Sequence, residues 1–268
     1  MLAPFETTKE LFTDNEWNSS LMYSQPPEKL HNLAYSDSVL CGIGESKKAL
    51  YCNSGTPDWV TIGNSSKIKQ MTMSKGYTCG VNDESSILCT QDILGNDNTG
   101  LWRQMNGSLD HVSLSENMIC GVKQEDEDPP NLWCAQMTGE DAIPWTKISN
   151  KNLRQVSVYN SSLCGVNKNN DVFCTNDVLA PFVDWRNIKG KFSHVDVFDD
   201  KVFGLSSNSN AYIYDKMENA NWKQLDKAST NSQISSIVGF LANTKKCCKY
   251  SLFIADNTQN ITLANYED

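Results

Sequence analysis

Residues 145–174 read WTKISNKNLRQVSVYNSSLCGVNKNNDVFC, and the chain repeats this stretch along its length. A second clear copy starts at Trp59 and includes Gln70-Met71-Thr72-Met73 and Cys79-Gly80-Val81-Asn82. Tryptophans spaced 37 to 43 residues apart begin the six copies: Trp17, Trp59, Trp102, Trp145, Trp185 and Trp222. A period near 40 residues is typical of repeat architectures, and one repeat cannot bury its apolar face without neighbours. We therefore expect residues 1–268 to form one domain of six repeats.

Within each repeat, apolar and polar residues alternate with a period of two. Val156 and Val158 share one face of their segment, as do Val195 and Val197 in the next repeat. Short alternating runs separated by Asn, Asp, Ser and Gly are typical of antiparallel strands joined by tight turns. Three or four such strands per repeat predict a propeller blade, so the fold class expected is an all-β, six-bladed β-propeller.

The two ends of the chain indicate how such a ring would close. The sixth repeat reaches almost to the C-terminus, and no tryptophan-led segment follows it. The N-terminal segment through Trp17 resembles the tail of a repeat. Because an open ring would expose two sheet edges, we predict that this N-terminal segment supplies the outer strand of the last blade.

Eight of the ten cysteines occur as one pair in each of four repeats. If each pair flanks a hairpin turn, its two members lie directly opposite each other, at a separation that a disulfide can bridge. The fifth repeat replaces both members at once, with Phe203 and Ile213, and the sixth does so with Phe253 and Leu263. Because both cysteines of a pair are replaced together, the two members of each remaining pair are expected to be bonded to each other. We predict the disulfides Cys41–Cys52, Cys79–Cys89, Cys120–Cys134 and Cys164–Cys174.

Two adjacent cysteines, Cys247 and Cys248, remain in the sixth repeat. A vicinal disulfide, a bond to another chain and free thiols are all open, and the vicinal bond is favoured. Neither a CxxC motif nor a Cys/His spacing of the zinc kind occurs in the chain, so no metal and no cofactor are expected.

The composition favours a secreted, extracellular protein. Paired cysteines indicate an oxidising compartment, and five N-x-S/T sequons mark candidate glycosylation sites at Asn18, Asn64, Asn106, Asn160 and Asn260. The chain opens on a polar segment without a signal peptide, so we expect a mature form whose leader has been removed. A net charge of −9 argues against a nucleic-acid partner. No run of eighteen apolar residues occurs, so membrane insertion is not expected.

The repeat pattern resembles the tectonin repeat, in which a tryptophan is followed by a Gln/His-Val-x-Val strand and a Gly-Val-Asn step. The copies led by Trp145 and Trp185 carry it most clearly, and the match spans essentially the whole chain. Tectonin repeats build six-bladed propeller lectins in fish eggs, slime moulds and mushrooms. The resemblance therefore implies a carbohydrate-binding protein that recognises cell-surface or microbial glycans at several sites, without catalysis, in defence, egg-coat or host-contact biology.

The chain departs from the family pattern after the Gly-Val step, where the residue type varies between repeats. We expect these variable positions to be the ligand-binding candidates: Asn82, Lys123, Asn167, Ser206 and Asp256. The alternative is an extracellular scaffold or effector that binds a protein partner through one face, since irregular turns break the symmetry that multivalent sugar binding would use. No enzyme motif, such as a GxSxG elbow, is present, so we do not expect an enzyme.

Structural roles compete with ligand binding at the other repeated positions. We expect most of the six tryptophans to pack between blades. A polar residue precedes the inner strand of successive repeats, and we expect it to line the channel or to bond to the next blade: Asn32, Gln70, His111, Gln155 and His194. The Asn of Gly-Val-Asn is typical of a turn that tolerates left-handed geometry.

Overall fold

Every regular element that the structure describes is a β-strand. The computed structural model describes residues 8–9, 17–20, 24–46, 48–63, 68–94, 102–116, 118–124, 132–137, 143–149, 151–216, 221–225, 234–241, 250–256 and 261–266. Within these ranges no helix is long and apolar enough to cross a membrane.

Five sheets have four antiparallel strands each, and we number them as blades 1 to 5. Blade 1 comprises β3 (Leu30–Ser36), β4 (Val39–Gly44), β5 (Leu50–Asn53) and β6 (Val60–Ile62). Blade 2 comprises β7 (Ile68–Ser74), β8 (Tyr77–Asn82), β9 (Ser86–Thr90) and β10 (Arg103–Ser108). Blade 3 comprises β11 (His111–Ser115), β12 (Met118–Val122), β13 (Leu132–Gln136) and β14 (Thr146–Ser149). Blade 4 comprises β15 (Gln155–Tyr159), β16 (Ser162–Val166), β17 (Asp171–Thr175) and β18 (Arg186–Lys191). Blade 5 comprises β19 (His194–Phe198), β20 (Lys201–Leu205), β21 (Ala211–Asp215) and β22 (Lys223–Gln224).

The remaining sheet has five strands and combines both ends of the chain. Its order is β1-β2-β25-β24-β23. The N-terminal strands are β1 (Thr8–Lys9) and β2 (Trp17–Ser20), and the C-terminal strands are β23 (Ile234–Leu241), β24 (Tyr250–Asp256) and β25 (Ile261–Tyr266). Where the sequence predicts six equivalent blades, the structure therefore has five regular four-stranded blades and one sheet of different composition.

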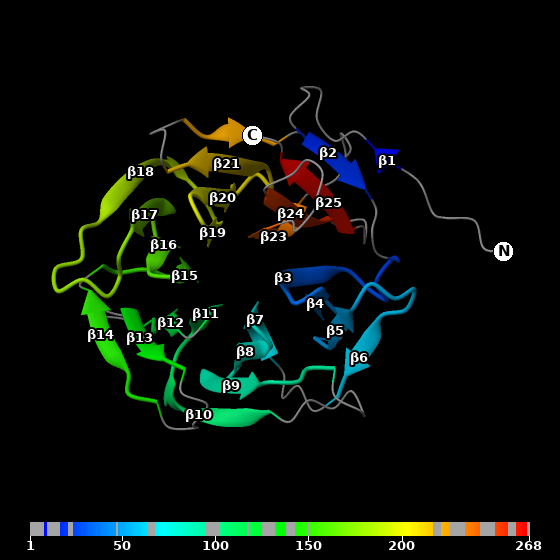
Figure 1. Ribbon diagram of the computed structural model, residues 1–268, viewed down its shortest axis with the longest axis horizontal. Helices are drawn as coiled ribbons and strands as arrows, with labels where there is room; N and C mark the ends of the chain where they lie inside the picture. The colour runs from blue at the N-terminus through cyan, green and yellow to red at the C-terminus, as the bar shows by residue number, and fades with distance from the viewer. Residues whose placement is uncertain are drawn as a thin grey trace.

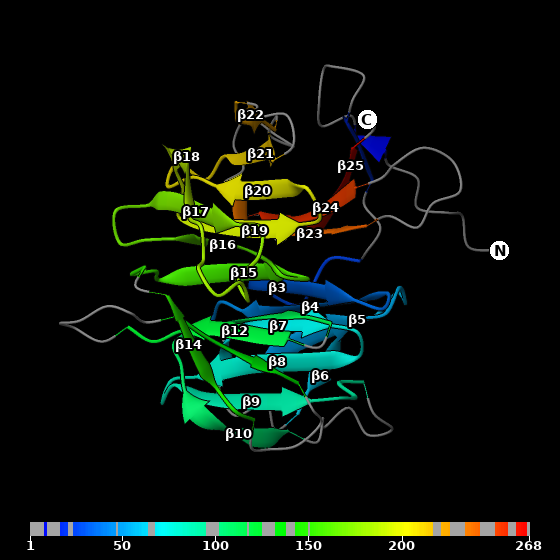
Figure 2. The same cartoon turned by 60° about the vertical axis from the view of Figure 1, so that its left-hand side comes forward.

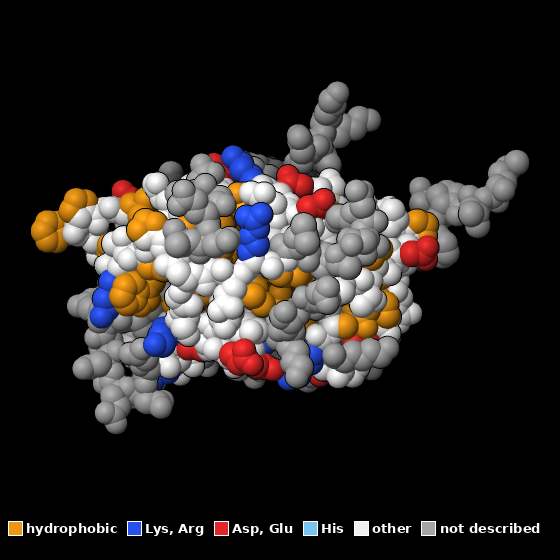
Figure 3. Space-filling view, turned by 90° about the horizontal axis from the view of Figure 1, so that it is seen from below, with side chains coloured by type: hydrophobic (Ala, Val, Ile, Leu, Met, Phe, Trp, Pro, Cys, Tyr) orange, Lys and Arg blue, Asp and Glu red, His pale blue; other side chains and the backbone are white. Residues whose placement is uncertain are grey.

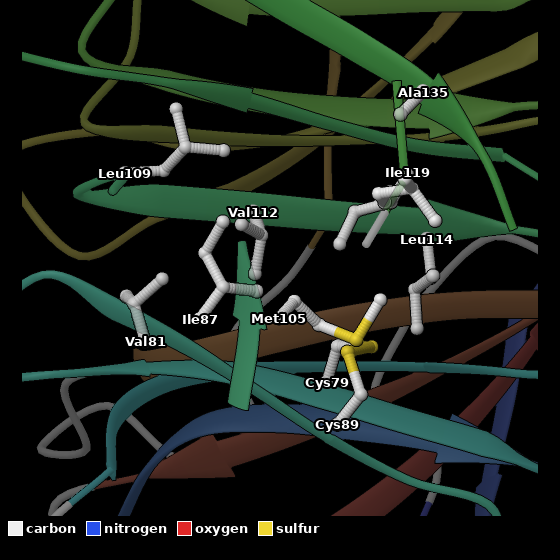
Figure 4. Close-up of a cluster of buried hydrophobic side chains, with 11 residues drawn as sticks. Cys79, Val81, Ile87, Cys89, Met105, Leu109, Val112, Leu114, Ile119 and Ala135 are labelled. Atoms are coloured by element: carbon white, nitrogen blue, oxygen red, sulfur yellow. A yellow bond between two sulfur atoms is a disulfide. The ribbon is translucent and has the colours of Figure 1, made fainter. Parts of the chain in front are cut away.

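The sheets are arranged around a central axis as a β-propeller, so the predicted all-β propeller fold is confirmed (Figures 1 and 2). The first strand of each unit lies at the centre, and the fourth strand of each blade lies on the rim (Figure 1). Alternation along each strand puts one set of apolar side chains between neighbouring blades. Between blades 2 and 3, for example, Val81, Ile87 and Met105 meet Leu109, Val112 and Ile119 (Figure 4). The core is thus a ring of layers between sheets.

All four predicted disulfides are confirmed. Each bridge joins directly opposed residues of the second and third strands of its blade, with Cα atoms 4.1 Å apart. In blade 5 the same register pairs Phe203 with Ile213, as the loss in pairs indicated. Each bridge closes a short loop, so it fixes one hairpin rather than the ring. Cys247 and Cys248 lie outside the described residues.

The rim tryptophans join neighbouring blades. The indole N–H of Trp145 in blade 3 donates to the carbonyl oxygen of Asn106 in β10 at 2.9 Å, and that of Trp222 donates to Lys189 in β18 at 2.7 Å. Glycines with positive φ follow both acceptors, Gly107 at 94° and Gly190 at 145°. A Cβ atom at Gly107 would lie 3.0 Å from Trp145 Nε1, so the glycine leaves room for the indole.

Because of this close approach, we expect Gly107→Ala to lower the free energy of unfolding by more than the strain of a positive φ alone would lower it. Gly55 is the matched control, because it has a φ of 84° and nothing lies within 4 Å of its would-be Cβ. Gly55→Ala should lower the free energy of unfolding by about 1 kcal/mol, and Gly107→Ala by about 1–3 kcal/mol more, in denaturant titrations of the oxidised protein. Equal losses in the two variants would contradict the packing role.

Candidate functional site

The inner strands surround a channel that contains a cavity of about 290 Å³. Side chains from the inner strands of all five numbered blades line the cavity. Because alternate residues of a strand share a face, the channel-facing residues form three layers. The register between first and second strands, together with the lining of the cavity, defines them. The first layer comprises Asn32, Gln70, His111, Gln155 and His194; the second comprises Ala34, Thr72, Ser113, Ser157 and Asp196; the third comprises Ser36, Ser74, Ser115, Tyr159 and Phe198.

In the first layer, two glutamines clamp the next blade. Gln70 donates from Nε2 to the carbonyl oxygen of Val112 at 2.8 Å and accepts from the N–H of Val112 at 2.9 Å. Gln155 makes the same pair of bonds with Val195, at 2.8 and 3.1 Å. Both amides are buried, so each saturates a backbone N–H and a carbonyl group that no strand pairs.

Hydroxyl groups continue this pattern in the second and third layers. Thr72 accepts from the N–H of Leu114 at 3.1 Å, Ser113 from Val158 at 3.0 Å, and Ser157 from Val197 at 2.9 Å. In the third layer Ser74 accepts from Glu116 at 2.8 Å and Ser115 from Asn160 at 2.6 Å. Each bond spans 40 to 45 residues along the chain, which is one repeat. A hydroxyl that accepts an N–H keeps its own proton to donate.

The irregularity in blade 1 leaves the expected role of Asn32 in place. Asn32 has a φ of 51° where the register shifts between His31 and Ala34, and it lines the cavity. Its Oδ1 accepts from the N–H of Met71 at 2.6 Å, just as Gln70 accepts from the N–H of Val112, so the expected bond to the next blade is confirmed. A one-residue bulge gives no signal in the repeat pattern.

The first layer also brings two histidines together. The rings of His111 and His194 face each other across 6.2 Å between centroids, and the Nδ1 atom of His111 is buried without a protein partner. Burial, with the nearby His194 and the charge of Arg154, lowers the pKa of His111 to about 3. Burial and Arg154 lower that of His194 to about 4. The pair is therefore neutral at physiological pH. Within the described residues, no three His, Cys, Asp or Glu side chains could hold a metal ion together.

Arg154 holds the connection between blades 4 and 5 at this end of the channel. Its guanidinium donates to the carbonyl oxygen of Ser193 at 2.6 Å, to Asn170 Oδ1 at 2.8 Å and to the carbonyl oxygen of Asn167 at 3.3 Å. Partial burial lowers its pKa, but an arginine stays charged under all physiological conditions. Burial is the main reason why the neighbouring imidazoles resist protonation, and the fixed cation adds to it.

The third layer forms the opposite end of the cavity, which we call the channel mouth. The rings of Tyr159 and Phe198 are in contact there, with centroids 4.3 Å apart and planes tilted by 43°. The turns beyond the layer are charged and linked between blades: Lys75 pairs with Glu116 at 2.8 Å, and Asp37 accepts from the N–H of Gly76 at 2.7 Å. Aromatic faces, hydroxyl donors and carboxylate acceptors thus meet in one concave surface.

The five predicted ligand-binding residues lie elsewhere. They follow the ends of the second strands, and three of them organise their own hairpin turns. Asn82 Oδ1 accepts from the N–H groups of Glu84 and Ser86 at 3.0 and 2.9 Å. Asn167 does the same for Asn169 and Asp171, both at 2.9 Å. Ser206 accepts from the N–H of Asn210 at 3.2 Å. Lys123 follows β12 and Asp256 ends β24, and the side chain of Asp256 is outside the described set.

The described sequons differ in accessibility. Asn106 in β10 is bound to blade 3, because its amide donates to the carbonyl oxygen of Ile143 at 2.9 Å and accepts from its N–H at 2.8 Å. Asn160 lies exposed in the turn after β15, with a φ of 53°. Asn18 lies in β2, where only the backbone is described, and Asn64 and Asn260 lie outside the described residues.

The fold and the channel define a disulfide-containing β-propeller whose blades follow a repeat of about 40 residues. The chain belongs to the tectonin family: the family model of the Tectonin domain matches residues 29–245. None of the curated proteins matches the sequence.

Three solved structures share the fold at low identity. A chain of the nidogen/laminin complex aligns with a TM-score of 0.57 at 14% identity, covering 75% of this chain and 80% of that one. The structure of YCF48 bound to D1 peptide aligns with a TM-score of 0.53 at 13% identity, covering 89% of this chain and 77% of that one. Prp20p from Saccharomyces cerevisiae aligns with a TM-score of 0.53 at 12% identity, covering 90% of this chain and 69% of that one. At these identities the likeness concerns the fold alone.

The buried histidine pair predicts a loss of stability in mild acid. In the unfolded chain both histidines titrate near pH 6.5, whereas the native pair takes up protons only near pH 3 and 4. Between pH 6.5 and 5 the unfolded state therefore binds more protons, and the free energy of unfolding falls as the pH falls, by at most about 1.4 kcal/mol per pH unit per histidine. The variant His111→Gln/His194→Gln, which introduces the residue type found at Gln70 and Gln155, should flatten this dependence in urea titrations. An unchanged slope would refute the assignment.

Proposed function

We propose that this protein is a secreted, disulfide-stabilised lectin that binds cell-surface or microbial glycans without catalysis. The observation that carries the proposal is the channel mouth, where the contacting rings of Tyr159 and Phe198 line the same cavity as hydroxyl and carboxylate groups. Small-molecule sites combine aromatic walls with a few placed polar groups, and a sugar offers an apolar C–H face together with hydroxyls. Membership of the tectonin family supports this choice.

The polar groups of the channel match what a sugar needs. Ser74 and Ser115 are held by the N–H groups that they accept, so each points its remaining proton from a fixed position. The carboxylate of Asp196 lines the same cavity and accepts from Ser157 at 2.6 Å. Because the ring of blades fixes these groups before binding, a ligand loses little affinity to ordering the site.

Multivalent binding would need further sites, and the hairpin turns are the proposed places. Asn82, Lys123, Asn167, Ser206 and Asp256 recur around one end of the propeller, and several weak sites on one rigid ring gain avidity without new contacts. The channel mouth is the stronger proposal, since the acceptor oxygens of Asn82 and Asn167 are already used within their own turns.

Four disulfides support an extracellular location, because such bonds persist in oxidising compartments. We propose Asn160 as the best glycosylation acceptor among the described sequons, since it lies in an exposed turn. A glycan there would stand next to Tyr159 and would narrow the channel mouth.

A second candidate function is the binding of a protein partner through one face. The specific observation is a pair of exposed apolar side chains, Leu179 at 54% and Phe182 at 93% exposure, on the connection between β17 and β18. Such side chains are typical anchors of protein interfaces.

We also infer that the five-stranded sheet acts as the sixth blade and that the N-terminal segment closes the ring. In support, β2 pairs with β25 from Trp17↔Tyr266 to Ser20↔Leu263. The indole N–H of Trp59 donates to the carbonyl oxygen of Ser24 at 2.8 Å, just as the rim tryptophans of blades 3 and 5 reach back to the preceding outer strand.

Deletion of residues 1–20 tests this closure. Without β2 the edge of β25 is unpaired, so we expect the Tm to fall by about 5 °C or more, the shift that a few kcal/mol produces in a chain of this size. The control is deletion of residues 1–7, which retains β1 and β2 and should lower the Tm by less. A full truncation as heat-stable as the intact chain would contradict the inference.

A glycan array probed with the oxidised protein tests the lectin proposal. We expect selective binding, and a loss of about tenfold or more in affinity for the best glycan in Phe198→Ala, which removes one wall of the channel mouth. Phe182→Ser, a change outside the channel, is the matched control and should bind as the unmodified chain does. A flat array would overturn the proposal, and full binding by Phe198→Ala would place the site elsewhere.

A further inference from the structure

The connection between β17 and β18 presents apolar side chains from a fixed backbone. Val178 is fully buried in the core between blades 3 and 4, and its N–H donates to the carbonyl oxygen of Ser161 at 2.8 Å. Trp185 packs against the same core at the other end of the connection. Next to the first anchor, the carboxylate of Asp177 accepts from the N–H of Leu179 at 3.0 Å.

Leu179 and Phe182 are the large apolar side chains that the described part of the chain leaves exposed. Figure 3 shows an apolar projection at its left edge, the side on which Figure 1 draws the connection between β17 and β18. Because the side chain of Phe182 is 93% exposed, it contributes almost no buried apolar area to the stability of the fold. Its position on an anchored connection lowers the entropic cost of using it as a contact.

A groove of about 590 Å³ adjoins these side chains between blades 4 and 5, and we call it the Phe182 groove. Phe182 and Tyr214 contribute apolar surface to its lining. Four carboxylates line it as well, against two cations: Asp177, Asp184, Asp199 and Asp200 against Arg186 and Lys216. Asp200 is also paired with Lys201 of β20 at 3.7 Å, and Lys216 donates to Ser162 Oγ at 2.9 Å. With Lys201 counted, the carboxylates still outnumber the cations by one.

The excess of carboxylates selects a cationic occupant. A further acidic side chain would add like charge to the groove, whereas a lysine or arginine would complement it. The apolar side chains at its border select a second feature, because an aromatic or aliphatic side chain of the partner can cover Phe182 and Leu179. Tyrosine, tryptophan, phenylalanine and arginine are the residues that interfaces favour for such anchors.

We propose that the Phe182 groove and Leu179 form a docking site for a protein segment that carries an aromatic or aliphatic side chain next to lysine or arginine. The proposal gives the protein-binding candidate a definite site and partner chemistry, and it is independent of glycan binding in the channel. Both functions can coexist, since the groove lies between blades at the rim and the channel lies on the axis.

A displayed random library of peptides of about twelve residues, selected against the full oxidised chain, tests the site. We expect enriched peptides with an apolar residue flanked by lysine or arginine. A synthetic peptide of the enriched sequence should lose about tenfold or more in affinity for Phe182→Ser and about threefold for Asp184→Asn. Its binding should also weaken as salt is raised from low to high ionic strength. Both side chains are exposed, so the variants should keep the Tm of the unmodified chain.

Glu84→Gln, which removes an exposed carboxylate in the turn between β8 and β9, is the matched charge control and should bind the peptide normally. Enrichment of peptides without basic residues, no enrichment, or equal binding by Phe182→Ser would overturn the proposal. Peptide binding lost in Phe198→Ala instead would move the protein site to the channel and leave the protein-binding candidate standing. Glycan binding lost in Phe182→Ser would show that the groove takes sugars, and would also overturn it.

Discussion

The inner edge of each blade sets the main constraint on this propeller. The first strand of every blade pairs on one side only, so its other side carries N–H and carbonyl groups that face the axis and have no strand partner. Side chains of the preceding blade saturate these groups, through glutamines in the first layer and hydroxyls in the other two. Each side chain bonds to a backbone one repeat away, so the blades are joined at the axis by hydrogen bonds and at the rim by indole N–H groups. Between these two seams lies the apolar packing that supplies most of the stability.

This arrangement explains the polar residues at the inner strands. In Gln155-Val156-Ser157-Val158 the valines face the neighbouring sheets and are buried, while Gln155 and Ser157 face the axis and bond to blade 5. Where a histidine replaces the glutamine, the clamp is replaced by an imidazole that faces the channel, as at His111 and His194. The two residue types have different roles. Glutamine fixes the position of the next blade through its backbone bonds, and histidine adds a neutral aromatic ring to the channel lining. A charged residue could do neither without a partner, because burial there penalises charge.

Much of the fold was predictable from the sequence because it depends on periodic features. The repeat period predicted the propeller, and the paired cysteines predicted the hairpin register, since the period recurs along the chain and the cysteine pair recurs in four of its repeats. The five-stranded sheet and the bulge at His31 were not predictable in detail, because each occurs once and depends on contacts between distant segments. The channel was not among the ligand-binding positions predicted from the sequence. Those positions are variable turn residues, and at two of them, Asn82 and Asn167, the side-chain oxygen caps its own hairpin. The hydroxyl layer had a signal, the polar residue between two valines, but only the structure shows which way it points.

The two proposed sites arise at different places in the repeat, one at the inner strands and the other at a connection between outer strands. The channel mouth forms where equivalent positions of neighbouring blades converge on the axis, so its character depends on substitutions such as serine to tyrosine or phenylalanine within one layer, at Tyr159 and Phe198. The Phe182 groove forms at a single blade connection. Val178 and Trp185 pack in the core at its two ends, and Leu179 and Phe182 between them are exposed. The serines of the layers serve both the seam between blades and the channel, since Ser74 and Ser115 accept N–H groups of the next blade and line the cavity. A change in the connection after Val178, in contrast, lies outside the channel lining. The tectonin scaffold can therefore alter its lateral site without changing the axis, whereas a substitution of a layer serine alters the channel and the seam together.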